Sequence, residues 1–91
     1  MNKTNGVWVF NGNNARFPSG VFDSVLNAEV WIERYSLTGI LTFYPLNISV
    51  YEWHIQNGWF IPSKEHHNTA EFIEKFSGGQ YHFHYENGKK D

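Results

Sequence analysis

The pattern with the clearest chemical potential is a set of three polar side chains at alternate positions, His82, His84 and Glu86. In an extended strand, alternate residues point from the same face, so two imidazoles and a carboxylate would lie side by side. Zinc and iron accept these ligands, although a site needs at least one further ligand, which His66 or His67 could supply from a loop. One hypothesis is therefore a small metal-binding or metal-dependent enzyme domain.

The same strand has a simpler interpretation. The polar positions alternate with Tyr81, Phe83 and Tyr85, which is typical of a sheet with one face in the core and the other in solvent. This interpretation requires no metal, and we favour it. We therefore expect no cofactor.

Other catalytic arrangements are missing from the sequence. The 91 residues include no cysteine, no serine in a nucleophile-elbow motif and no glycine-rich phosphate loop with its lysine. Glu29 with Glu33, and Glu71 with Glu74, are spaced by about one helical turn. Both pairs are expected on solvated helix faces, where carboxylates are ordinary. We expect a protein that is not an enzyme.

The secondary structure that must position these side chains follows from periodicity and turn residues. Alternating apolar runs predict strands at 7–10, 16–22, 39–44 and 80–86. Helical spacing after capping residues predicts helices at 25–35 and 70–77. Gly39 is assigned to the left-handed position that ends the first of these helices.

The segment 49–61 is ambiguous, because two rules disagree. A Ser-x-x-Glu capping box begins at Ser49 and predicts a helix that Gly58 would end. Alternating aromatic and polar residues up to Asn57-Gly58 are instead typical of a hairpin. We favour the helix, and the hairpin remains open.

These elements have the order β-β-α-β-α-α-β. They predict a single α+β domain over residues 1–91, with a four-stranded, mostly antiparallel sheet and its helices packed on one face. Residues 1–5 and 87–91 are expected to be frayed tails.

Charge and hydropathy argue against nucleic acid and membranes as partners. The formal charge is −2, and the nearest approach to a basic stripe is Lys89-Lys90, so no nucleic acid is expected as a ligand, even one stacked on aromatic rings. The sequence has no signal peptide and no apolar stretch long enough to span a membrane. Together with the lack of cysteine, this predicts a cytoplasmic protein that binds no membrane.

The aromatic content is the main functional indication. Four Trp, five Tyr and eight Phe make up 19% of the chain, which exceeds what a small core should need, and exposed Trp and Tyr often anchor protein interfaces. Four of them, Tyr51, Trp53, Trp59 and Phe60, lie in the ambiguous segment. The candidate partner-binding residues there are Tyr51, Glu52, Trp53, His54, Trp59 and Phe60.

Several stretches resemble a family of small, functionally uncharacterised bacterial domains. The matching pieces are Val7–Gly12, Ala15–Phe22, Ala28–Ile32, Leu41–Pro45, Tyr51–Trp53 with Gly58, Glu71–Ile73 with Phe76, and His82–Gly88. The resemblance implies no activity and no catalytic residue. A free-standing bacterial domain of this size suggests, by analogy, the immunity proteins that neutralise a toxin by binding it. Our leading hypothesis is therefore a protein-binding module, an immunity-type inhibitor that covers the active site of a cognate bacterial toxin.

Overall fold

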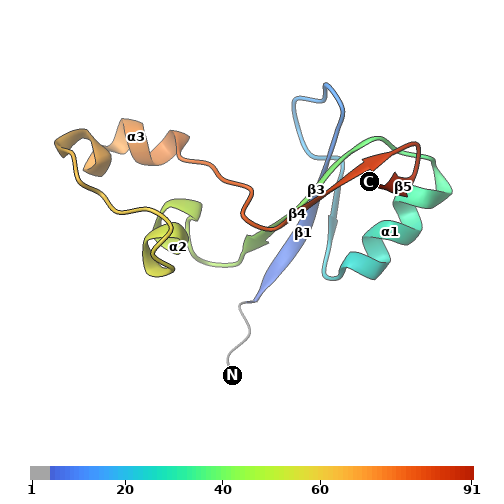
Figure 1. Ribbon diagram of the computed structural model, residues 1–91, viewed down its shortest axis with the longest axis horizontal. Coiled ribbons are helices and arrows are strands. Elements are labelled where there is room, and N and C mark those ends of the chain that lie inside the picture. Colours follow the sequence, from blue (N-terminus) through green and yellow to red (C-terminus); the bar gives the residue numbers. More distant parts are fainter. Residues whose placement is uncertain (1–4) are drawn as a thin grey trace.

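The computed structural model describes residues 5–91, and the part of the expected N-terminal tail at 1–4 lies outside the described residues. The elements are β1 (Gly6–Gly12), β2 (Gly20–Phe22), α1 (Val25–Arg34), β3 (Gly39–Pro45), α2 (Val50–Gln56), the 3-10 helix η1 (Glu65–Asn68), α3 (Ala70–Lys75), β4 (His82–Glu86) and β5 (Lys89–Lys90). The strands form one antiparallel sheet in the order β2-β1-β3-β4-β5 (Figure 1). The α+β class is confirmed, and the sheet has five strands instead of four.

The centre of the sheet is the pairing of β1 with β3, which runs from Gly6 opposite Pro45 to Gly12 opposite Gly39. Trp8 lies opposite Phe43, and two residues further on Phe10 lies opposite Leu41. Because side chains alternate along a strand, these four side chains share one face of the sheet. This face holds the core.

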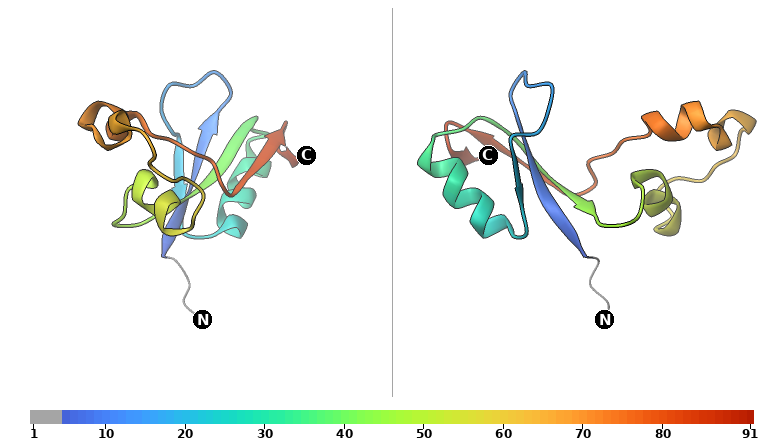
Figure 2. Two further views of the ribbon diagram at one scale, coloured as in Figure 1. Left: turned by 60° about the vertical axis from the view of Figure 1, so that its left-hand side comes forward. Right: turned by 180° about the vertical axis from the view of Figure 1, so that it is seen from behind.

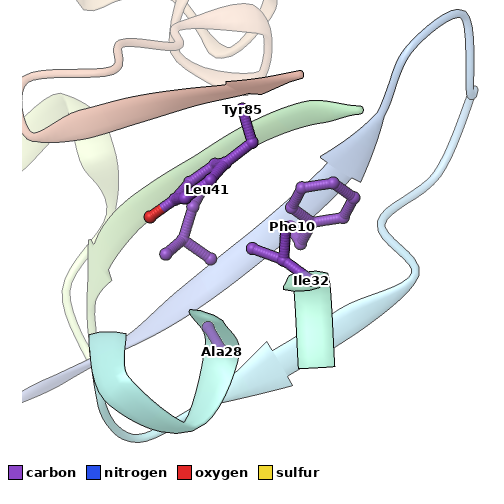
Figure 3. Close-up of a cluster of buried hydrophobic side chains, with 5 residues drawn as sticks. All are labelled: Phe10, Ala28, Ile32, Leu41 and Tyr85. Carbon is purple, nitrogen blue, oxygen red and sulfur yellow. The ribbon is translucent and has the colours of Figure 1, made fainter. Parts of the chain in front are cut away.

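Helix α1 covers one end of that face. Its buried residues Ala28 and Ile32 pack against Phe10, Leu41 and Tyr85 (Figure 3). The helix begins where the Ser24 side chain accepts a hydrogen bond from the backbone N–H of Asn27 at 3.1 Å. The predicted first helix is therefore confirmed, and of the two adjacent residues able to cap it, Asp23 and Ser24, the serine does so.

The prediction that Gly39 ends this helix in a left-handed conformation is wrong. Ser36 takes that conformation, with φ of 53°, and the N–H of Leu37 donates to the carbonyl of Ile32 at 2.9 Å. Gly39 lies in β3, where a Cβ atom would be 2.2 Å from the carbonyl oxygen of Asn11. Glycine is needed there for close strand approach.

The segment 49–61 contains a helix, as favoured, and not a hairpin. The Ser49 side chain accepts from the N–H of Glu52 at 2.9 Å, and its hydroxyl donates to the Glu52 carboxylate at 3.1 Å. After the helix, Gly58 has φ of 73°. Local capping therefore outweighs the alternating pattern.

Helix α2 belongs with η1 and α3 to a second unit, which we call the helical lobe (residues 49–77). Trp53 of α2 packs against Phe43 of β3, with ring centroids 5.9 Å apart. Phe43 is on the core face, so α2 contacts the same face as α1. The prediction that the helices pack on one face of the sheet is correct for these two only, because α3 lies away from the sheet (Figure 1). Phe72 of α3 and Phe76, the residue after its end, pack on Tyr51 of α2, with ring centroids 6.3 and 5.5 Å away.

The helical lobe gives the molecule an elongated shape. Helices α1 and α3 lie at opposite ends of the long axis (Figures 1 and 2), and the extents are 46 × 35 × 21 Å. The radius of gyration is 14.9 Å, whereas a compact chain of this length has about 12 Å. No helix among residues 5–91 has the length and apolar character needed to cross a membrane.

The expected C-terminal tail at 87–91 is instead the second half of a hairpin. Asn87 and Gly88 have φ of 54° and 86°, the conformation that a two-residue turn with a favourable twist requires. The N–H of Gly88 donates to the carbonyl of Leu37 at 2.8 Å. Pairing of Lys89 and Lys90 with β4 then forms β5.

Gly88→Ala should lower the free energy of unfolding by about 1 to 2 kcal/mol, because a left-handed residue with a Cβ atom is strained. A Cβ atom there would also lie 3.0 Å from the Cα of Ser36, whereas at Gly58 it would meet nothing within 4 Å. Gly58→Ala is thus the matched control, and urea unfolding should show the smaller loss for it. Equal losses would mean that the contact with Ser36 is unimportant.

Candidate protein-binding surface

The candidate partner-binding residues differ in burial. Tyr51, Trp53 and His54 are buried, with Trp53 only 5% exposed. They form the interior of the helical lobe together with Phe60, Phe72 and Phe76. In this structure the three side chains are packing residues, and they present no surface to a partner.

Polar contacts explain why two of these buried side chains are tolerated. The Tyr51 hydroxyl donates to the main-chain oxygen of His67 at 2.8 Å and so connects α2 with η1. His54 Nδ1 lies 2.9 Å from the carbonyl oxygen of Val50. A carbonyl can only accept, so this nitrogen carries the proton. The Tyr51 hydroxyl and His54 Nδ1 are therefore hydrogen-bonded inside the lobe.

Two aromatic side chains remain at the surface next to this interior, and we call them the Trp59–Tyr81 corner. Trp59 is 36% exposed and Tyr81 is 51% exposed. Their ring centroids are 5.9 Å apart and their planes meet at 83°. Two large rings from separate segments thus form an exposed right angle.

The corner is held in place from behind. The ring of buried Trp53 lies 5.1 Å from that of Trp59 and 6.1 Å from that of Tyr81. The backbone N–H of Trp59 donates to the carbonyl of His54 at 2.9 Å, and the N–H of Phe43 donates to the carbonyl of Tyr81 at 2.9 Å. The corner therefore joins the helical lobe to the sheet.

A row of half-buried rings continues from the corner toward α1. The ring of Phe43 lies 6.5 Å from that of Tyr81 and 5.4 Å from that of Trp8, and Trp8 stacks on Phe83 at 5.6 Å. All these rings are on the core face of the sheet. Exposed aromatic rings backed in this way are typical anchors of protein interfaces, because little side-chain entropy remains to be lost on binding.

The remaining two candidates contribute less. Glu52 is exposed, and its carboxylate accepts the hydrogen bond from Ser49 that caps α2. Phe60 is half-buried, with its ring 5.8 Å from that of Phe72. Of the predicted residues, Trp59 is the one whose ring is both large and exposed.

Tyr81 was not among the candidates, because alternation along the last strand places it on the inward face with Phe83 and Tyr85. Tyr81 does lie on that face, but it is exposed because β4 begins only at His82 and α1 covers the other end of the sheet. The glycines at 78 and 79 could have indicated that the strand does not extend back to Tyr81.

The His82, His84 and Glu86 side chains project from the opposite face of the sheet, which no helix covers in the described chain. The rings of His82 and His84 are 5.0 Å apart, and His82 Nδ1 is hydrogen-bonded to the carbonyl of Gly79. Within residues 5–91, no three His, Cys, Asp or Glu side chains are grouped so that they could hold a metal ion. The geometry thus offers the metal hypothesis no additional ligand.

This uncovered face is partly apolar. Val9 lies between Val21 of β2 and Thr42 of β3, and Ile40 lies opposite His84. Val21 and Ile40 are exposed. It is a second apolar surface, but it lacks large rings with a rigid backing.

One polar cluster joins α1 to the C-terminal hairpin. The buried Tyr85 hydroxyl donates to a Glu29 carboxylate oxygen at 2.6 Å, and the Lys90 ammonium lies 3.1 Å from the same oxygen. The hydrogen bond from Tyr85 and the charge of Lys90 lower the pKa of Glu29, while partial burial opposes them. Burial and then Glu29 raise the pKa of Tyr85 far above its ordinary value. Glu29 was expected on a solvated helix face, and its contact with Tyr85 and Lys90 could not be predicted from helical spacing.

The lowered pKa of Glu29 predicts a pH dependence of stability. The ionised carboxylate favours the fold, so its contribution is complete above the ordinary carboxyl pKa and is lost as the pH falls through the lower folded value. Glu29→Gln should therefore be less stable than the wild type at pH 7, and the difference in unfolding free energy should shrink below about pH 4. Glu33→Gln, on the exposed side of α1, is the control. A difference that stays constant with pH would exclude this role.

A surface pocket of about 570 Å³ lies beside α3 and is lined by His66, Thr69, Glu71, Phe72, Lys75, Phe76 and Ser77. Its charged groups have opposite signs. Among the described residues, no buried side-chain polar atom lacks a hydrogen-bond partner. The described residues therefore give the pocket no buried side-chain polar atom that lacks a hydrogen-bond partner and could bind a ligand.

Taken together, these features define a small α+β domain with a five-stranded open sheet and an aromatic corner where its helical lobe meets the sheet. Residues 7–91 match the family described as a domain of unknown function, DUF7710. The chain belongs to this family, which confirms the resemblance to small uncharacterised domains. No curated protein and no solved structure is similar enough to the chain to count as a match.

Proposed function

We propose that this domain binds another protein and that the Trp59–Tyr81 corner is the centre of the interface. The observation that carries the proposal is the exposure of two large rings, 36% for Trp59 and 51% for Tyr81, on a rigid backing. Burying both rings against a partner would remove apolar surface from water, and little side-chain conformational entropy would be lost because the rings are already held in place. The indole N–H and the phenol hydroxyl would provide hydrogen bonds at the edge.

We further propose that the partner is a bacterial toxin whose active site the domain covers. The support is the small size of the domain and its formal charge of −2, which would attract a basic partner such as a nuclease. Acidic side chains on the inhibitor accelerate association with such an enzyme.

Site-specific photo-crosslinking in cells tests the protein-binding proposal. A benzophenone amino acid replaces Ile61, which is 74% exposed and two residues from Trp59. A matched probe replaces Leu26, which is 70% exposed on α1 at the other end of the molecule. We expect a protein adduct from position 61 and none of the same mass from position 26. Identical adducts from both positions, or none from either, would contradict the proposed surface.

The identity of the adduct tests the finer proposal. If the partner is a toxin, the domain should protect cells that express this toxin, and the double variant Trp59→Ala, Tyr81→Ala should not. Leu26→Ala should protect like the wild type. An adduct with a protein that is harmless to the cell would exclude the inhibitor role and leave the binding role in place.

A further inference from the structure

His67 of η1 holds the loop before it through a ring nitrogen. Its Nδ1 accepts hydrogen bonds from the backbone N–H groups of Ser63 at 3.1 Å and Lys64 at 3.2 Å. A nitrogen that accepts these bonds cannot itself carry a proton. The ring is therefore neutral, with its single proton on Nε2.

The same residue connects the three parts of the helical lobe. Its ring centroid lies 5.1 Å from that of Phe60 and 4.8 Å from that of Phe72 in α3. Its main-chain oxygen accepts from the Tyr51 hydroxyl of α2 at 2.8 Å. A change in the loop at His67 would therefore affect the packing of both α2 and α3.

We propose that His67 is an acid-sensitive contact, and that protonation of its ring releases η1 and α3 from α2. A proton on Nδ1 would face two N–H donors, so both backbone hydrogen bonds would be lost and their groups left without an acceptor. Opening would uncover Phe60 and Phe72. This proposal does not depend on the function proposed above.

No ion pair of the described residues would compensate a positive charge on this ring. On its own segment, the charged groups that act on its pKa are Lys64 and His66, whose ring centroid is 4.5 Å away, and the Glu65 carboxylate of the same segment forms no ion pair with it. From α2 the facing group is the uncharged Tyr51 hydroxyl, and from α3 it is the ring of Phe72. Within the described residues, no carboxylate lies at ion-pair distance from His67.

The direction of the pH dependence follows from these surroundings. Partial burial lowers the pKa of His67, and the positive charges of His66 and Lys64 lower it further. The neutral ring is therefore the one the fold favours. Its contribution to stability is complete above the ordinary pKa of 6.5 and is lost as the pH falls through the lower folded value.

Amide hydrogen exchange of Ser63 and Lys64, corrected for intrinsic rates, tests the proposal between pH 7 and pH 5. In the wild type, protection should fall by up to about tenfold per pH unit below the ordinary histidine pKa. In His67→Asn, whose side-chain oxygen can accept but cannot gain a proton here, protection should not change with pH. His84→Asn, on the uncovered sheet face, should behave like the wild type.

Two results would overturn the proposal. One is equal protection of these amides in the wild type at both pH values. The other is a pH-dependent loss in His67→Asn that matches the wild type. If His67→Asn fails to fold, the ring nitrogen shifts of the wild type decide the matter: a proton on Nε2 at pH 7 is expected, and a proton on Nδ1 would exclude the contact.

Discussion

Trp53→Ala is expected to lower the free energy of unfolding by about 3 to 5 kcal/mol, the usual loss when a buried tryptophan is truncated. The side chain is 5% exposed and packs on Phe43 of the sheet and on Tyr81, with ring centroids 5.9 and 6.1 Å apart. Since α2 reaches the sheet through this ring, the helical lobe should detach first. Denaturant unfolding measures the total loss, and amide exchange in α3 measures the detachment.

Trp59→Ala is the matched control for that experiment. It removes the same side chain, 36% exposed, from a position six residues further along the chain. Its stability loss should be clearly smaller than that of Trp53→Ala, because more of this ring is already in contact with solvent. If both variants lose equal stability, Trp59 is part of the core and cannot be a free anchor.

The second large effect concerns binding. Against the partner identified by crosslinking, Trp59→Ala should weaken affinity by about 2 to 4 kcal/mol, or roughly thirtyfold to a thousandfold, as expected for a central aromatic anchor. Tyr81→Ala should act in the same direction. Isothermal titration calorimetry with purified proteins measures both.

The binding measurement has its own control. Leu26→Ala removes an apolar side chain that is 70% exposed on α1, and it should leave the affinity unchanged. The double variant Trp59→Ala, Tyr81→Ala should lose less than the two single losses together, because the rings support each other. A loss caused by Leu26→Ala and none by Trp59→Ala would move the interface to α1.

Local rules predicted much of the fold. The capping box at Ser49 identified α2 correctly, although the residues that follow also alternate in the manner of a strand. Hydrogen bonds between a cap and the first turn act over three residues, so they can be read from sequence. The start of α1 was predicted in the same way, from two adjacent residues able to cap it. Alternation along the chain, another local rule, predicted the inward face of the last strand.

Positions that depend on distant contacts were harder to predict. Gly39 looked like a helix terminator, but it is required because the carbonyl of Asn11 approaches from another strand. The turn at Asn87-Gly88 was mistaken for the start of a tail, although its residues favour a hairpin. Only the docking of Gly88 on the carbonyl of Leu37 shows why so short a final strand is ordered.

The candidate surface was predicted in part. The aromatic content correctly indicated exposed rings, and Trp59 is one of them. Burial of Trp53 and exposure of Tyr81 both follow from where the helical lobe meets the sheet, which is a tertiary contact between segments separated along the chain. Composition can show that rings exceed the needs of a core, but it cannot show which rings remain outside.

The most direct test of the central claim is an NMR titration of the four indole N–H signals, one from each tryptophan, with the crosslinked partner. The signal of Trp59 should shift or broaden at the first additions, while those of Trp31 and buried Trp53 stay close to their free positions. An unperturbed Trp59 signal in a saturated complex would show that the partner binds elsewhere.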